Sequence, residues 1–170
     1  ISGATAEEME LLSNSAKELG ASTAFTAGEG AGLQKELAKV GFDPNEIEAM
    51  TGAAFDLAVA FGKDNAGTGG VVGVVLNSYS LEASEATRVT DILASAFSST
   101  ALDLQKFNVA FPKVGAIASQ LGFSLEGTTA LLGQLSNAGL EASTAGTSLR
   151  NIFLKLADSN SALSQRLGGS

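Results

Sequence analysis

The chain of 170 residues carries 10 Lys and Arg residues against 18 Asp and Glu residues, which gives a formal net charge of −8. This charge has the wrong sign for attracting a phosphate backbone, so we expect no direct nucleic-acid binding by this chain. The sequence contains no Cys, His or Trp, which excludes disulfides, Cys-based zinc sites and nucleophilic triads that depend on His.

The first third of the chain contains three helix starts. In each, a residue that can cap a helix is followed three positions later by Glu, as in a capping box. The pairs are Thr5 with Glu8, Thr26 with Glu29, and Asp43 with Glu46, where Pro44 takes the first helical position. The first two segments run to Gly20 and Gly41, residues typical of helix C-caps. We therefore predict three helices in this region.

Two of these helices carry apolar residues at steps of three and four, as expected for a face that packs on a core. The first set is Met9, Leu12, Ala16 and Leu19, and the second is Ile47, Met50, Ala54, Leu57 and Phe61. We predict that both sets are buried.

The glycine-rich stretch at residues 67–73 reads Gly-Thr-Gly-Gly-Val-Val-Gly. A dinucleotide fingerprint would need Gly at position 72, which is Val, and the Lys-Ser/Thr ending of a phosphate loop is missing. We therefore predict a flexible loop that enters a close-packed helix, without a cofactor. Residues 71–76 are rich in Val, a β-branched residue that favours strands, but a strand without a partner strand is unstable. We therefore predict that these residues are helical.

The second half of the chain contains four more predicted helix caps, and glycines again mark predicted helix ends. The predicted caps are Ser84, Asp103, Ser124 and Ser143. The apolar residues that we expect in the core behind them are Val89, Ile92, Leu93, Ala96, Phe97, Phe107, Phe111, Val114, Ile117, Leu121, Leu131, Leu132, Leu135, Leu149, Ile152, Phe153 and Leu156. Gly122 and Gly139 are the expected ends, and Pro112 predicts a kink. We expect a last short turn around Leu163 and Leu167.

The resulting fold class is all-α: a compact multi-helix bundle or array of about seven to nine short helices joined by short loops. We expect residues 1–170 to form a single helical domain that is flexible from about residue 159 onward. The start at Ile1, without a signal peptide, leads us to expect a fragment of a longer chain. The most apolar stretches, 53–61 and 71–76, are far shorter than the roughly 20 residues that span a bilayer, so we expect no transmembrane segment.

A short phrase recurs in the chain. Leu-Glu-Ala-Ser occurs at residues 81–84 and again at 140–143, each time before a predicted helix that carries an Arg. Two occurrences of a good helix start do not establish a repeat, because a solenoid needs at least three copies.

No residue pattern indicates catalysis. Glu7 with Glu8, or Asp56 with Asp64, would be the nearest to an acid/base pair, but such work needs two carboxylates in contrasting environments around a cleft. We interpret them as solvated helix charges. We therefore expect no catalytic, cofactor-binding or metal-binding residues, no cofactor and no enzymatic activity.

The chain has 45% hydrophobic and only 16% charged residues, so few surface charges keep copies apart. We therefore expect self-association.

Several phrases, in order, resemble the conserved core region of phage tail tape-measure proteins, from about Glu8 to Ala157. They are residues 16–23 with Phe25, Thr26 and Glu29; 40–42 with Glu46 and Ile47; 80–86 with Arg88, Val89 and Asp91; 114–115 with Ala118; 121–122 with Ser124 and Glu126; and 137–139 with Ser143, 145–147 and 149–150. The departures are Gly28, Gly30 and Gly32, where the family is richer in Ala, and residues 67–70, where a continuous acidic helix is typical.

The resemblance implies a structural virion protein, from a phage or a prophage. A parent chain of this family lies in the lumen of the tail tube, sets the tail length, and takes part in tail assembly and DNA ejection. Its expected partners are tail tube, baseplate and assembly-chaperone proteins, and it is found in the host cytoplasm during assembly. From the residues alone, a cellular helical adaptor stays open as the alternative, and a cell-wall hydrolase elsewhere in the parent chain as a third.

Overall fold

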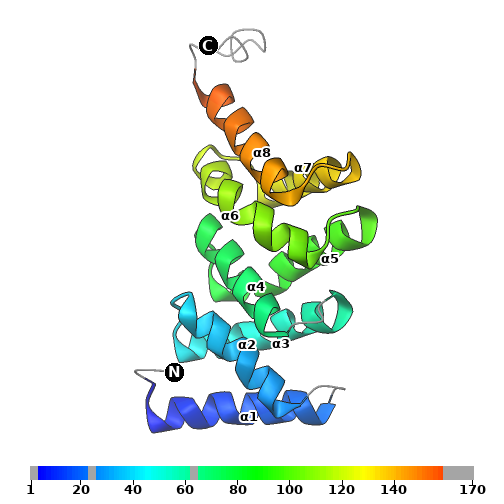
Figure 1. Cartoon of the computed structure of the whole chain (residues 1–170). Helices are drawn as coiled ribbons and strands as arrows, with labels where there is room; N and C mark the ends of the chain where they lie inside the picture. The colour runs from blue at the N-terminus through cyan, green and yellow to red at the C-terminus, as the bar shows by residue number, and fades with distance from the viewer. Residues whose placement is uncertain (1–3, 23–25, 62–64, 159–170) are drawn as a thin grey trace. The chain divides into compact units, whose positions relative to one another are not determined.

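The computed structural model describes residues 4–22, 26–61 and 65–158, and within these ranges the regular backbone is helical throughout, with no strand (Figure 1). The elements are α1 (Ala6–Ser22), α2 (Ala27–Lys39), α3 (Pro44–Phe61), α4 (Asn65–Tyr79), the 3₁₀ turn η1 (Ala83–Glu85), α5 (Ala86–Ser99), α6 (Leu104–Gln120), α7 (Leu125–Asn137) and α8 (Ala142–Ala157). The prediction of an all-α array of short helices is confirmed.

The three capping boxes predicted in the first third of the chain are present. The backbone N–H of Thr5 donates to Glu8 Oε2 over 2.7 Å, and the N–H of Glu8 donates back to Thr5 Oγ1 over 3.2 Å. Thr26 and Glu29 make the same pair of bonds, and Asp43 with Glu46 makes a third. These bonds satisfy backbone donors that the first helical turn leaves open, so the cap residues fix where each helix begins.

Two later helix starts differ from the prediction. Ser84 lies inside η1, and α5 begins only at Ala86. Ser143 is the second residue of α8, whose cap is Glu141: its carboxylate accepts from the N–H of Thr144 over 3.0 Å. Both predicted caps were therefore wrong. In α8, the carboxylate of Glu141, two residues before Ser143, caps the helix as well as a hydroxyl would.

The helix ends follow the glycine prediction in three of four places. Gly41, Gly122 and Gly139 have positive φ of 103°, 79° and 80°, a conformation that glycine adopts without steric cost. Gly20 is not an end, because α1 continues to Ser22. α6 runs through Pro112 from Leu104 to Gln120, and the kink there stays a prediction.

The contacts divide the chain into two compact units, residues 1–94 and 95–170. In the first unit, α2 packs against α1, α3 and α4, around a core that includes Leu33, Leu37, Ile47 and Phe55. In the second unit, α6 packs against α7 and α8. The rings of Phe107 and Phe111 stack 4.7 Å apart there, and those of Phe123 and Phe153 stack 3.9 Å apart. That both units form one domain stays a prediction.

Most of the predicted core residues are buried, but several lie at the surface. Met9, Phe61, Leu121, Leu131 and Ile152 are between 37% and 43% exposed. Leu131 and Ile152 each precede a buried residue by one position, which places them beside the face of the helix that packs on the core. The predicted turn around Leu163 and Leu167, and the predicted flexibility from residue 159, lie outside the described residues.

Candidate interaction surface

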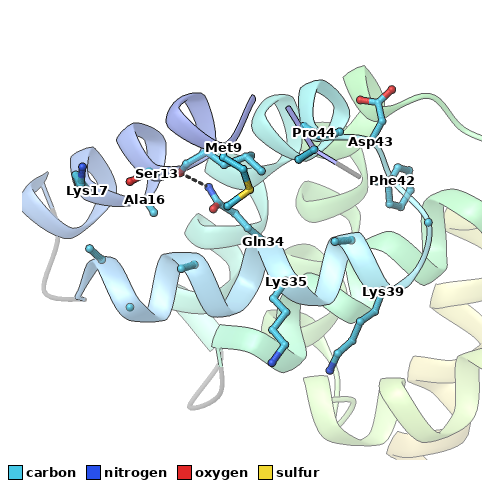
Figure 2. A pocket seen from close by; sticks show the side chains of 17 residues that line it. Met9, Ser13, Ala16, Lys17, Gln34, Lys35, Lys39, Phe42, Asp43 and Pro44 are labelled. Carbon is cyan, nitrogen blue, oxygen red and sulfur yellow. Dashed lines mark hydrogen bonds between the residues drawn. The ribbon is translucent and has the colours of Figure 1, made fainter. Parts of the chain in front are cut away.

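An open groove of about 1030 Å³ runs between α1, α2 and the turn into α3 (Figure 2). Small residues form much of its lining: Ser13, Ala16, Ala27, Gly28, Ala31 and Ala38. Met9, Leu12 and Phe42 add apolar surface. Small side chains let a second helix approach its neighbours closely, so the groove has the surface character of a helix-packing site.

Gln34 is the polar feature of the groove. Its side chain is only 3% exposed, and Nε2 donates to the backbone oxygen of Leu12 over 3.1 Å, as the dashed line in Figure 2 shows. This bond joins α2 to α1, and it gives the buried amide of Gln34 a partner for its N–H group. Gln34 therefore sets the spacing of the two helices that form the groove.

The charged residues of the groove are mainly basic, although the chain is acidic overall. Lys17, Lys35 and Lys39 line it, together with the carboxylate of Asp43. Asp43 caps α3 through the N–H groups of Asn45 and Glu46, and Lys39 pairs with Glu36 over 2.6 Å. An apolar floor with lysines around it fits an amphipathic partner helix that carries acidic side chains, and it does not fit a cation.

The glycine-rich stretch at 67–73 lies inside α4, so the predicted loop was wrong. A Cβ on Gly69 would lie 2.8 Å from the backbone oxygen of Leu33, and one on Gly73 would lie 2.5 Å from a methyl of Val40. These glycines let α4 pack closely on α2. Their purpose is packing, and the cost of glycine in a helix is offset by the contact.

The carboxylates considered as acid/base candidates lie in different settings where the structure describes them. Glu8 is used by the cap of α1, Asp56 is exposed on α3, and Asp64 lies outside the described residues. The described part of the chain holds no group of three or more His, Cys, Asp or Glu residues that could bind a metal ion. In that same part, no helix is long and apolar enough to cross a membrane.

Glu29 and Glu141 have a lowered pKa, and both act in helix caps. Backbone and side-chain hydrogen bonds from Thr26 lower the pKa of Glu29, and backbone N–H groups of Ser143 and Thr144 lower that of Glu141. The bonds stabilise the charged form, which is the usual effect of donors at a helix N-terminus. These shifts therefore mark structural caps.

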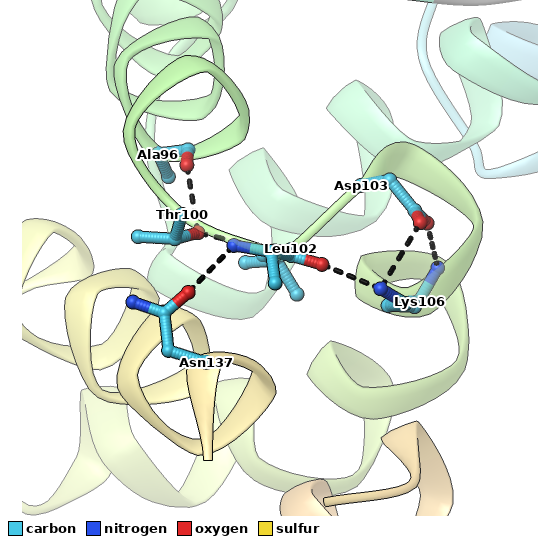
Figure 3. A network of polar contacts seen from close by, with 7 residues as sticks. Ala96, Thr100, Leu102, Asp103, Lys106 and Asn137 are labelled. Carbon is cyan, nitrogen blue, oxygen red and sulfur yellow. Dashed lines mark hydrogen bonds and ion pairs between the residues drawn. The ribbon is translucent and has the colours of Figure 1, made fainter. Parts of the chain in front are cut away.

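A polar network in the second unit joins the end of α5, the start of α6 and the end of α7 (Figure 3). The backbone N–H of Ala101 donates to Asn137 Oδ1 over 2.7 Å, and that of Leu102 to Thr100 Oγ1 over 3.1 Å. Lys106 donates to Ala101 O and pairs with Asp103 over 3.4 Å. The network holds a turn between helices and leaves no reactive group at its centre.

Sequence reasoning did not find the groove. Met9 was placed in a core stripe with Leu12 and Ala16, but it is 43% exposed, whereas Leu12 and Ala16 are buried. The available signal was the sequence of α1 and α2, which places small residues and lysines at the positions that line the groove.

The chain is similar to known proteins over nearly its whole length. The model of a family described as phage-related minor tail protein matches residues 13–169. A tape measure protein of Pneumococcus phage Dp-1 is 38% identical over 164 residues, 96% of this chain but 14% of that protein. A probable tape measure protein of Escherichia phage P2 is 29% identical over 149 residues, 88% of this chain and 18% of that protein. No solved structure matches.

Proposed function

The chain belongs to the phage-related minor tail protein family, and we propose that it is a non-enzymatic helical segment of a longer tape measure protein. The observation that carries the proposal is the continuous match: residues 13–169 fit the tail family, and two tape measure proteins align with 96% and 88% of the chain. Each of those proteins is several times longer than the aligned region.

The parent protein then acts as a ruler. It lies in the lumen of the tail tube, sets tail length by its extent, takes part in assembly in the host cytoplasm, and leaves ahead of the DNA. Because the present segment is folded into short capped helices, its own share of the length is small, and an extended region elsewhere in the parent supplies most of the ruler. Tail tube, baseplate and chaperone proteins are its partners, and the weakly charged helix surfaces favour self-association.

The test is an immunoblot with an antibody raised against this segment, on gradient fractions of phage-producing cells. A second antibody against the tail tube subunit marks the fractions that contain tails. We expect a band much larger than the 170-residue chain that sediments with the tails. A short band in soluble fractions without tails would instead identify a cellular helical adaptor and contradict the proposal.

The non-enzymatic part of the proposal has its own test. The purified chain is incubated with bacterial cell walls, and soluble fragments are measured. We expect none above the background of a heat-unfolded sample. Release that disappears on Glu8→Gln or Asp56→Asn substitution would show that the segment is a hydrolase.

A further inference from the structure

The helices α3 and α6 bury six matching positions once their numbering is shifted by 60. Each begins after an Asp cap, Asp43 and Asp103 (43 to 103). Six buried positions of α3 have a buried counterpart in α6 under the same shift. The pairs are Ile47 and Phe107, Met50 and Ala110, Thr51 and Phe111, Ala54 and Val114, Phe55 and Gly115, and Ala58 and Ala118. Side-chain identity changes, but the buried face is the same.

The next helices, α4 and α7, extend this correspondence to specific contacts. A Cβ on Gly73 would meet Val40, and one on Gly133 would meet Thr100, positions again related by 60 (73 to 133, 40 to 100). Four residues later, Asn77 Nδ2 donates to Val40 O over 2.8 Å, and Asn137 Oδ1 accepts from the N–H of Ala101 over 2.7 Å. In both places a Gly-x-x-x-Asn face crosses the end of an earlier helix.

The flanking helices follow the same period. In α2 and α5 the buried pairs are Gly30 and Thr90, Leu33 and Leu93, and Leu37 and Phe97. In α8 the residues Gly146, Leu149 and Phe153 correspond to Ala86, Val89 and Leu93 of α5, and in α1 the residues Leu12 and Ala16 correspond to Val72 and Leu76 of α4. The chain therefore holds two full copies of a three-helix repeat, preceded by the third helix of another copy and followed by the first helix of a further one.

The repeat shows which neighbour α1 lacks. The face of α4 that packs on α2 consists of Gly69, Gly73 and Asn77. Under the shift of 60, the same face of α1 consists of Met9, Ser13 and Lys17, and these three residues line the open groove (Figure 2). Met9 is 43% exposed there. No described helix takes the place on α1 that α2 takes on α4.

We propose that this groove binds the helix one repeat upstream in the parent tape measure protein, the counterpart of α2. The inference rests on the proposed function, because it requires a longer parent chain. Its occupant is an amphipathic helix that places apolar residues on Met9, Leu12 and Ala31, with acidic side chains near Lys17 and Lys35. The small residues that line the groove admit it at close range.

Thiol labelling tests the proposal, because the chain contains no Cys. Ser13→Cys places one thiol in the groove, and Asn14→Cys, the matched control, places one on the next exposed position of α1 outside the groove. Each is made in the 170-residue chain and in the parent protein, with any other Cys of the parent replaced. We expect the Ser13→Cys thiol to react at least about tenfold more slowly in the parent, with the Asn14→Cys thiol unchanged.

Two results would overturn the inference. Equal reactivity of the Ser13→Cys thiol in both proteins would mean that no upstream helix covers the groove. Protection that arises in the 170-residue chain as its concentration rises would mean that a second copy covers it. Neither result bears on whether the parent sediments with tails, so a failure here is distinct from a failure of the proposed function.

Discussion

At the scale of single residues, the helical glycines fall into two classes that local sequence does not separate. Gly69 faces α2, where an added Cβ would lie 2.8 Å from a backbone oxygen, whereas Gly52 in α3 has nothing within 4 Å of that position. Alanine is the better helix former at both sites by about 1 kcal/mol. The tertiary contact decides which site can accept it.

We predict opposite effects of alanine at these two glycines. Gly69→Ala should lower the free energy of unfolding by about 1–3 kcal/mol, because the backbone of Leu33 cannot move away as a flexible side chain could. Gly52→Ala should raise it by about 0.5–1 kcal/mol. Both lie in the first compact unit, so urea unfolding followed by circular dichroism compares them directly. Equal changes at the two sites would show that α4 does not approach α2 this closely.

At the scale of helices, two Asn residues at equivalent positions of α4 and α7 bond through different atoms of the side-chain amide. Asn77 uses its Nδ2 and Asn137 its Oδ1. Asn77 must donate, because its partner is the carbonyl of Val40, and Asn137 must accept, because its partner is the N–H of Ala101. The partners are backbone groups with fixed character, so the orientation of each amide follows from them.

Substitution by Asp should therefore have different effects on stability in α4 and in α7. Asn77→Asp removes a donor and places a carboxylate beside a carbonyl oxygen, so we expect a loss of about 0.5–1.5 kcal/mol of stability at pH 7. Asn137→Asp keeps the acceptor, and the change in stability should be smaller than about 0.5 kcal/mol. Asn→Ala at each position gives the reference for the lost bond. If both Asp variants lose the same stability, these bonds do not fix the ends of α4 and α7.

The helix starts could be predicted from sequence because their determinants are local. Thr26 and Glu29 are three residues apart and satisfy each other's backbone donors, whatever the rest of the chain does. The glycines of α4 could not be interpreted in this way. Their role depends on Leu33 of α2 and on Val40, the residue that follows α2, and without that contact a glycine-rich stretch indicates a loop.

The groove and the repeat were beyond sequence reasoning for related reasons. The exposure of Met9 depends on which helices pack on α1, and a pattern of apolar steps carries no such information. The repeat is conserved in burial far more than in identity: Met50 corresponds to Ala110 and Phe55 to Gly115. The recurring phrase at 81–84 and 140–143 gives a spacing of 59, one residue short of the shift of 60, and two occurrences were too few to establish a period.

At the scale of the whole chain, a repeat makes stability a sum of copies and of the contacts between neighbouring copies. A deletion that respects the period then leaves each remaining helix with a neighbour of the kind that it had before. Removal of residues 43–102 joins Phe42 to Asp103, so that the turn after α2 leads into α6 in place of α3. The cap of the helix is kept, because Asp103 takes the position that Asp43 had.

We expect this shortened chain to keep its helix content per residue and to unfold cooperatively, since Phe107, Phe111 and Val114 present the same buried face as Ile47, Thr51 and Ala54. The matched control deletes residues 43–92, which joins Phe42 to Leu93 in the middle of α5 and breaks the register. The control should lose cooperativity, because its apolar face no longer meets a core. Circular dichroism during thermal and urea unfolding compares the two chains. If the control folds as well as the in-register deletion, the shift of 60 has no structural meaning, and the reason for assigning an upstream helix to the groove on α1 is lost with it.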